Sequence, residues 1–238
     1  EITAINIDGG TRDISFYNAA GTSQALFWDA SAESLGIGTT SPDALLDISS
    51  ATTSTLRLSN SDIALTEGQI TGQLEFYQGD TSSQGTGITG KIAMRSVPLT
   101  GGGYFGNAAD MDFYVSGDSN GYASNNATLK ALTIQAGSGN VGIGTDSPET
   151  NLHVKGGSDM GIRIESANDG YASLQFGDAD DTVRGGITYN NADDSLQLRG
   201  YNNTERMRIS SSGNVGIGSS DPQSTLQVAS LAETSIPA

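Results

Sequence analysis

A phrase that occurs three times limits the folds open to this chain. Residues 139–154 read GNVGIGTDSPETNLHV, residues 213–228 read GNVGIGSSDPQSTLQV, and residues 35–48 read LGIGTTSPDALLDI, without the opening Gly-Asn. The glycines and prolines common to the copies are Gly36, Gly38, Pro42, Gly142, Gly144, Pro148, Gly216, Gly218 and Pro222. Such a recurring phrase indicates a repeat architecture, in which each unit buries its apolar surface against its neighbours.

Stretches of alternating apolar residues flank each copy of the phrase. This alternation, interrupted by clusters of Gly, Asn, Asp and Ser, predicts short half-buried β-strands. Before the phrase the stretches are Leu26-Phe27-Trp28, Leu132-Thr133-Ile134 and Met207-Arg208-Ile209, and after it they are Leu46-Asp47-Ile48, Leu152-His153-Val154 and Leu226-Gln227-Val228. Further strands are expected at Leu56-Arg57-Leu58, Ile162-Arg163-Ile164, Leu74-Glu75-Phe76 and Leu174-Gln175-Phe176. The predicted fold is all-β: an elongated, repeat-built fibre of short strands and turns with very little helix.

The phrase itself has a physical interpretation. In Val141-Gly142-Ile143-Gly144 the glycines remove bulk from one face of a strand, so that another backbone can approach closely. Ser147-Pro148 is typical of an N-cap followed by proline at the first helical position. Because the next strand begins shortly afterwards, we expect one helical turn or a tight turn here.

The copies of the phrase also divide the chain into units. Residues 1–38 are expected to end a first repeat unit, residues 39–144 to form a second, residues 145–218 a third, and residues 219–238 the start of a further unit or a C-terminal tail. The second unit is longer than the third because it contains a Gly/Asn/Tyr-rich insertion at about 80–128.

The composition restricts both the core and the partners of the chain. Only 35% of the residues are hydrophobic, so short strands depend on neighbouring units or a partner chain to complete their core. The formal net charge of −16 argues against binding to nucleic acid or to an anionic membrane surface. No apolar run is long enough for membrane insertion. Because cysteine is absent, there is no disulfide framework and no thiolate metal site, and we expect no cofactor.

The sequence offers little support for catalysis. The single histidine, His153, alternates with aliphatic residues and is interpreted as an exposed or interfacial strand residue. Two clusters of carboxylates, at 178–181 and 193–194, are interpreted as turns, although a glycosidase pair needs only two carboxylates in a cleft. We therefore predict that the chain is not an enzyme.

The insertion is the best candidate for a binding surface. Aromatic rings can stack on sugars, and amides and carboxylates can bond sugar hydroxyls. The candidate receptor-binding residues are Tyr104, Phe105, Asp110, Asp112, Tyr114, Tyr122 and Asn125. The alternative is a structural hairpin, since residues 111–115 alternate like a plain strand. Trp28 occupies the position of Ile134 and Ile209 in the other units, which favours a packing role for its ring.

The phrase GNVGIGT-x-SP-x-x-x-LHV, preceded by RISSSGNVGIG, resembles the repeats of long bacteriophage tail fibres. Similar repeats occur in fibre proteins that end in an endosialidase-type self-cleaving chaperone. The resemblance covers most of residues 25–65 and 130–228 and implies a homotrimeric, β-rich shaft that carries host-binding surfaces. The first copy departs from the pattern, with Ala32-Glu33-Ser34 where the others have Gly-Asn.

The resemblance implies a structural component of the virion, outside the cell, that forms a rigid trimeric shaft and contributes to host attachment. Its partners would be other tail or baseplate proteins and a host cell-surface polysaccharide or outer-membrane receptor. Two alternatives come from other classes: a tailspike-like polysaccharide depolymerase, and a non-viral bacterial surface adhesin or extracellular filament protein.

Overall fold

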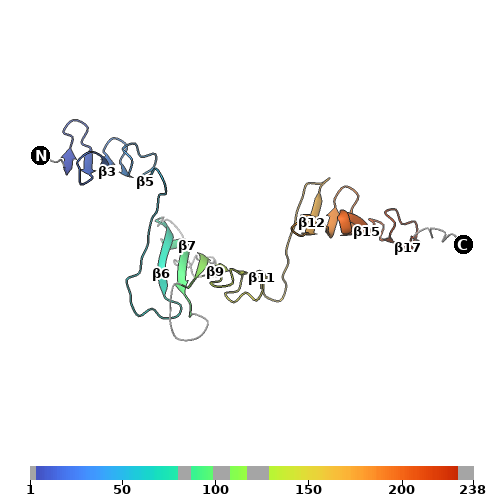
Figure 1. Ribbon diagram of the computed structural model, residues 1–238. Helices are drawn as coiled ribbons and strands as arrows, with labels where there is room; N and C mark the ends of the chain where they lie inside the picture. Colours follow the sequence, from blue (N-terminus) through green and yellow to red (C-terminus); the bar gives the residue numbers. More distant parts are fainter. Residues whose placement is uncertain (1–3, 80–86, 99–107, 117–128, 230–238) are drawn as a thin grey trace. The chain divides into compact units, whose positions relative to one another are not determined.

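The computed structural model describes residues 4–79, 87–98, 108–116 and 129–229. These residues form an all-β structure of three sheets, as the sequence predicted (Figure 1). The only helical element among them is a 3-10 turn at Tyr201–Asn203. Within each sheet, strands that follow one another in the chain are hydrogen-bonded neighbours.

Each sheet is an antiparallel meander, except that its last strand runs parallel to the strand beside it. The first sheet consists of β1 (Ile5–Ile7), β2 (Ile14–Tyr17), β3 (Gln24–Asp29), β4 (Ser34–Ile37) and β5 (Leu46–Ile48). The second consists of β6 (Ile70–Gln78), β7 (Gly87–Ser96), β8 (Ala109–Val115), β9 (Leu129–Ile134), β10 (Val141–Ile143) and β11 (Leu152–Val154). The third consists of β12 (Tyr171–Phe176), β13 (Gly185–Asn190), β14 (Ser195–Gly200), β15 (Thr204–Ile209), β16 (Val215–Ile217) and β17 (Leu226–Val228). All pairings are antiparallel except the last in each sheet, β4–β5, β10–β11 and β16–β17, which are parallel.

The three copies of the phrase have the same strand register. The central glycine of the phrase faces the middle residue of both neighbouring strands. The matching trios are Phe27, Gly36 and Asp47; Thr133, Gly142 and His153; and Arg208, Gly216 and Gln227. The strands predicted on either side of the phrase are thus confirmed.

The loop that joins the two parallel strands folds back over one face of the sheet. Parallel neighbours usually need a connection of about a dozen residues or more, yet here the loop is shorter. A Cβ at Gly142 would collide with the carbonyl oxygen of Thr145, so glycine makes the close approach possible, as predicted. Asn140 Nδ2 then donates to the carbonyl of Pro148 (3.2 Å), and Pro148 is buried. Asn214 and Pro222 repeat this contact at 3.0 Å.

The proline-containing loops form no helical turn in the described residues and consist of bends and irregular backbone. Two other expected strands are also absent. Residues 56–58 and 162–164 belong to no strand, because they have no neighbouring strand within the described chain.

The predicted unit boundaries at 38/39, 144/145 and 218/219 all fall in loops between two paired strands. Each sheet therefore continues across the predicted boundary and ends after the phrase. Of the predicted insertion at 80–128, β7 and β8 belong to the second sheet, and much of the remainder lies outside the described residues. By compactness the chain divides into the units Glu1–Gly157 and Ser158–Ala238.

Candidate functional site

Every sheet exposes an apolar face. In the third sheet, the cross-strand pairs form two apolar rows that continue through all its strands. The first row consists of Leu174, Ile187, Leu198, Met207, Ile217 and Val228, and the second of Ala172, Tyr189, Leu196, Ile209, Val215 and Leu226. Ile187 is 43% exposed and Leu226 is 60% exposed, which is unusual for large aliphatic residues in a sheet.

The other two sheets repeat this arrangement. The rows of the second sheet are Leu74, Ile92, Phe113, Leu132, Ile143 and Val154, and Gly72, Met94, Met111, Ile134, Val141 and Leu152. Those of the first sheet are Ile5, Phe16, Leu26, Ile37 and Ile48, and Ile7, Ile14, Trp28, Leu35 and Leu46. Trp28 holds the register position of Ile134 and Ile209, as the sequence predicted, and is half-buried.

The opposite face of each sheet is polar, yet it is the buried one. In the third sheet the residues of this face include Thr188 (6% exposed) and Gln197 (2%). Among the described residues only two hydrophobic side chains are buried, Phe27 in the first sheet and Ala93 in the second, and both lie on the polar face of their sheet. A sheet with one solvated face normally turns its apolar side inward. Here the loop after each phrase glycine covers part of the polar side, and the apolar side has no partner within the described chain.

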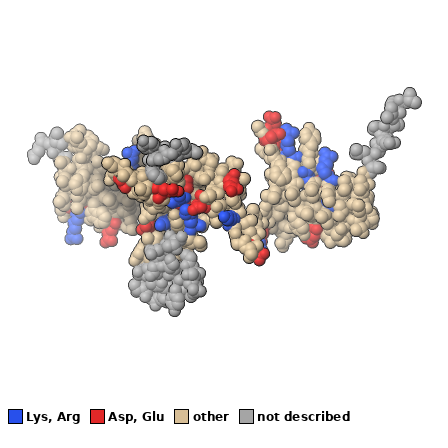
Figure 2. Space-filling model, turned by 90° about the horizontal axis from the view of Figure 1, so that it is seen from below, with Lys and Arg blue, Asp and Glu red and all other residues tan. Residues whose placement is uncertain are grey.

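The rows leave a large apolar area that a partner could cover. Full burial of one aliphatic side chain is worth about 1.5–3 kcal/mol. If about half of that remains to be gained at each exposed position, one sheet would gain on the order of 10 kcal/mol, similar to the stability of a whole domain. Acidic and basic side chains lie beside one another in several places, and much of the visible surface carries neither (Figure 2).

The polar face of the second sheet contains a buried cluster of charges. Arg95 on β7 bonds Asp110 (2.5 Å) and Asp112 (2.7 Å), which lie two residues apart on β8. Thr133 Oγ1 donates to Asp112 Oδ1 (2.7 Å), and Lys130 Nζ lies 3.2 Å from Asp112 Oδ2. Asp112 therefore receives bonds from two neighbouring strands, and its side chain has no exposed surface.

These contacts determine the protonation of the cluster. Burial alone would raise the pKa of Asp112, but the bonds from Arg95, Thr133 and Lys130 outweigh burial, and the pKa lies below its ordinary value. Burial and the negative charge of Asp112 raise the pKa of Tyr114. Asp112 is thus held as a carboxylate and Tyr114 as a neutral phenol, which suits a structural network.

The structure brings three of the predicted receptor-binding residues together, Asp110, Asp112 and Tyr114, all on β8. Asp110 and Asp112 are buried and already bonded to cations, so they do not present their carboxylates to an external ligand in this arrangement. Tyr114 is half-buried, and its ring lies 4.5 Å from Lys91 Nζ. The other candidates, Tyr104, Phe105, Tyr122 and Asn125, lie outside the described residues, so receptor contact at the insertion stays a prediction.

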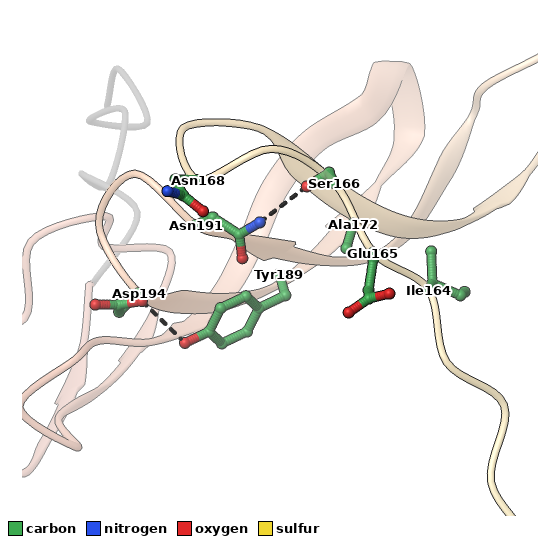
Figure 3. Close-up of a pocket in the computed structure, with 8 residues that line it drawn as sticks. All are labelled: Ile164, Glu165, Ser166, Asn168, Ala172, Tyr189, Asn191 and Asp194. Atoms are coloured by element: carbon green, nitrogen blue, oxygen red, sulfur yellow. Dashed lines mark hydrogen bonds between the residues drawn. The ribbon is translucent and has the colours of Figure 1, made fainter.

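A concave region of about 520 Å³ lies at the start of the third sheet (Figure 3). Its lining residues are Ile164, Glu165, Ser166, Asn168, Ala172, Tyr189, Asn191 and Asp194. The Tyr189 hydroxyl donates to Asp194 (3.2 Å), and Asn191 donates to Ser166 (2.9 Å). Sequence reasoning missed this region, because it forms where residues before β12 fold beside β13, and no motif marks that contact.

His153 has a structural role. Its Nδ1 accepts a hydrogen bond from the Glu149 amide (3.4 Å), directly after the proline of the loop. Asp47 accepts the equivalent bond from Asp43 (3.1 Å), and Gln227 accepts that from Gln223 (2.8 Å). Three different side chains perform the same task, so the position requires an acceptor and no specific histidine chemistry.

Within the described parts of the chain, no cluster of His, Asp and Glu side chains is arranged to hold a metal ion. The described residues also contain no helix of the length and hydropathy that a membrane crossing requires. No protein-family model matches the sequence, and no curated protein has a significant match to it. The geometry of the sheets therefore carries the functional argument.

Proposed function

We propose that this chain is a structural segment of a bacteriophage tail fibre, which acts as a homotrimer in the virion and forms a rigid shaft that contributes to host attachment. The supporting observation is the inverted burial of the sheets: the buried residues gather on the polar face, and the residues of the apolar rows are half-buried or exposed. Copies of the chain that turn these faces toward a shared axis would complete one core along all three sheets. The resemblance of the phrase to tail-fibre repeats supports the same proposal.

The number of three copies follows from the resemblance to tail-fibre repeats, and a closed symmetric assembly fits the apolar faces. Long protein assemblies are usually symmetric, and a closed ring of identical chains leaves no apolar face unpaired. The shaft would connect to other tail or baseplate proteins, and a host polysaccharide or outer-membrane receptor would bind its outward surface. The buried polar networks, such as the Arg95 cluster, would keep each sheet rigid within the shaft.

Electron microscopy of the purified chain, combined with an activity assay, tests this proposal. We expect rods of uniform width whose averaged cross-section has threefold symmetry. Incubation with host capsule or lipopolysaccharide should release no reducing ends. Round single-chain particles, or sugar cleavage by the purified chain, would contradict the proposal.

A further inference from the structure

Two linkers have the sequence pattern of strands but no partner strand in their own chain. They are residues 53–60, between β5 and β6, and residues 160–166, between β11 and β12. Both follow the phrase at the same distance and both contain an apolar–Arg–apolar triplet. The structure assigns neither triplet to a strand among the residues it describes.

The backbone of these linkers is unpaired. Within the described ranges, residues 53–59 and 160–165 form no hydrogen bond with any other backbone group. Backbone N–H and C=O groups that become buried need partners, and strand pairing is the usual way to supply them. The linkers therefore have free backbone groups where the sequence pattern favours pairing.

The apolar side chains of both linkers are also largely exposed. Leu56 is 65% exposed and Leu58 is 51% exposed, while Ile162 is 67% exposed and Ile164 is 44% exposed. These residues follow β5 and β11 in the sequence, where the apolar rows end. Their chemistry matches the exposed faces of the sheets and contrasts with the charged Arg57 and Arg163 between them.

Each linker also borders a concave region at the start of the following sheet. Residues 57–61 line one together with residues 70–73 of β6. Ile164 and Glu165 line the other, with Ala172 and Tyr189 on the facing strands (Figure 3). A concave surface therefore borders the linker at the start of both the second and the third sheet.

We infer that each linker packs against the same linker of the other copies in the homotrimer, with Leu56, Leu58, Ile162 and Ile164 turned toward the shared axis. This inference rests on the proposed function. A second copy is the favoured occupant because every copy carries both linkers, so one symmetric arrangement supplies an apolar partner at both places simultaneously. Strand addition between chains uses backbone groups of this kind.

Single-cysteine cross-linking tests the inference, because the chain contains no cysteine of its own. Ile162→Cys places a thiol on the expected inner side, and Arg163→Cys is the matched control on the opposite side. After mild oxidation, we expect at least a fivefold higher yield of disulfide-linked dimer for Ile162→Cys. Peptide mass spectrometry should show that the bond joins two copies of the same linker peptide. Leu58→Cys and Arg57→Cys repeat the comparison in the other linker.

Sedimentation measures the assembly state of each variant, and so distinguishes a failure of the linker contact from a failure of the chain to form a trimer. A trimer with equal cross-linking of both variants, with none, or with bonds to a different peptide would overturn the inference and leave the proposed function intact. A monomeric unsubstituted chain would instead overturn the proposed function. If Ile162→Cys itself fails to assemble, Ile164→Cys places a thiol on the same side of the same linker. A trimer of Ile164→Cys that does not cross-link would also overturn the inference.

Discussion

Glu33 and Ser34 replace the Gly-Asn pair of the other copies of the phrase, and the turn before the strand is still formed. Glu33 has φ of 53°, where Gly139 (72°) and Gly213 (84°) occupy the equivalent positions. The turn is therefore maintained by a non-glycine residue in the left-handed region. Ser34 replaces the asparagine of the other copies, and its buried hydroxyl has no hydrogen-bond partner in the described chain.

Ser34→Asn should stabilise the first sheet. An asparagine here could donate to the Pro42 carbonyl, as Asn140 donates to Pro148 and Asn214 to Pro222. One hydrogen bond typically contributes about 1 kcal/mol, and removal of an unsatisfied hydroxyl adds to the gain. Chemical unfolding at one protein concentration measures the change. Ser34→Ala is the control, since it removes the hydroxyl without adding a bond. Equal stability of the two variants would argue against the proposed contact.

Asp112→Asn should weaken the protein by about 3 kcal/mol at pH 7, because it leaves Arg95 and Lys130 beside a neutral side chain in a buried site. Unfolding monitored by circular dichroism measures this loss. Asp169→Asn, at an exposed turn, is the control and should have little effect.

The same carboxylate predicts a dependence on pH. The folded pKa of Asp112 lies below its unfolded value of about 3.9, so its contribution is complete above that value and disappears as pH falls through the folded pKa. The unsubstituted chain should lose stability below about pH 4, and Asp112→Asn should lose less over that range. Parallel acid unfolding curves for the two proteins would contradict this role.

At the scale of strands and loops, the recurring element is a strand whose central glycine lets the loop that follows pack closely against it. Gly142→Ala should force the Thr145 carbonyl away from the strand and cost about 2 kcal/mol. Gly157→Ala is a matched control, because a Cβ there meets no atom within 4 Å. Thermal unfolding of both variants, at equal concentration, measures the difference. An unchanged melting temperature for Gly142→Ala would contradict the close approach.

The sequence was sufficient to predict the strands on both sides of the phrase, because alternation and glycine spacing act locally. It did not predict that the strands around the proline loop are parallel. The loop satisfies its carbonyl through Asn140 and Asn214, which lie outside the turn, and propensity rules do not include such contacts. In all three loops the amide of the residue after the proline donates to a side chain of the next strand (Asp47, His153 or Gln227), and no helical turn follows.

Residues 56–58 and 162–164 fit the strand pattern but form no strand in the described chain. Their alternation indicates which side chains favour burial, whereas strand formation also needs a neighbouring backbone.

For the predicted binding residues on β8, too, the sequence pattern was not sufficient. Asp and Tyr side chains are of the types that recognise sugars. Only the structure reveals that Arg95 already forms ion pairs with Asp110 and Asp112, and that Lys130 forms one with Asp112.

At the scale of the whole molecule, we expect the exposed apolar rows to determine whether copies of the chain associate in solution. Ile187→Asp places a charge in the middle of one row, where it should block association of the third sheet. We expect a clear shift from trimer to monomer or to partly separated chains in size-exclusion chromatography. Asp180→Asn, in an exposed turn, is the control. Retention of the full assembly by Ile187→Asp would argue against burial of this face.

The mass of the unsubstituted chain in dilute solution, measured by sedimentation equilibrium, tests the central claim most directly. If the apolar faces of three copies share one core, the mass is three times that of a single chain and stays constant across a wide range of concentrations. A stable, soluble monomer would show that these faces need no partner, and would contradict the account.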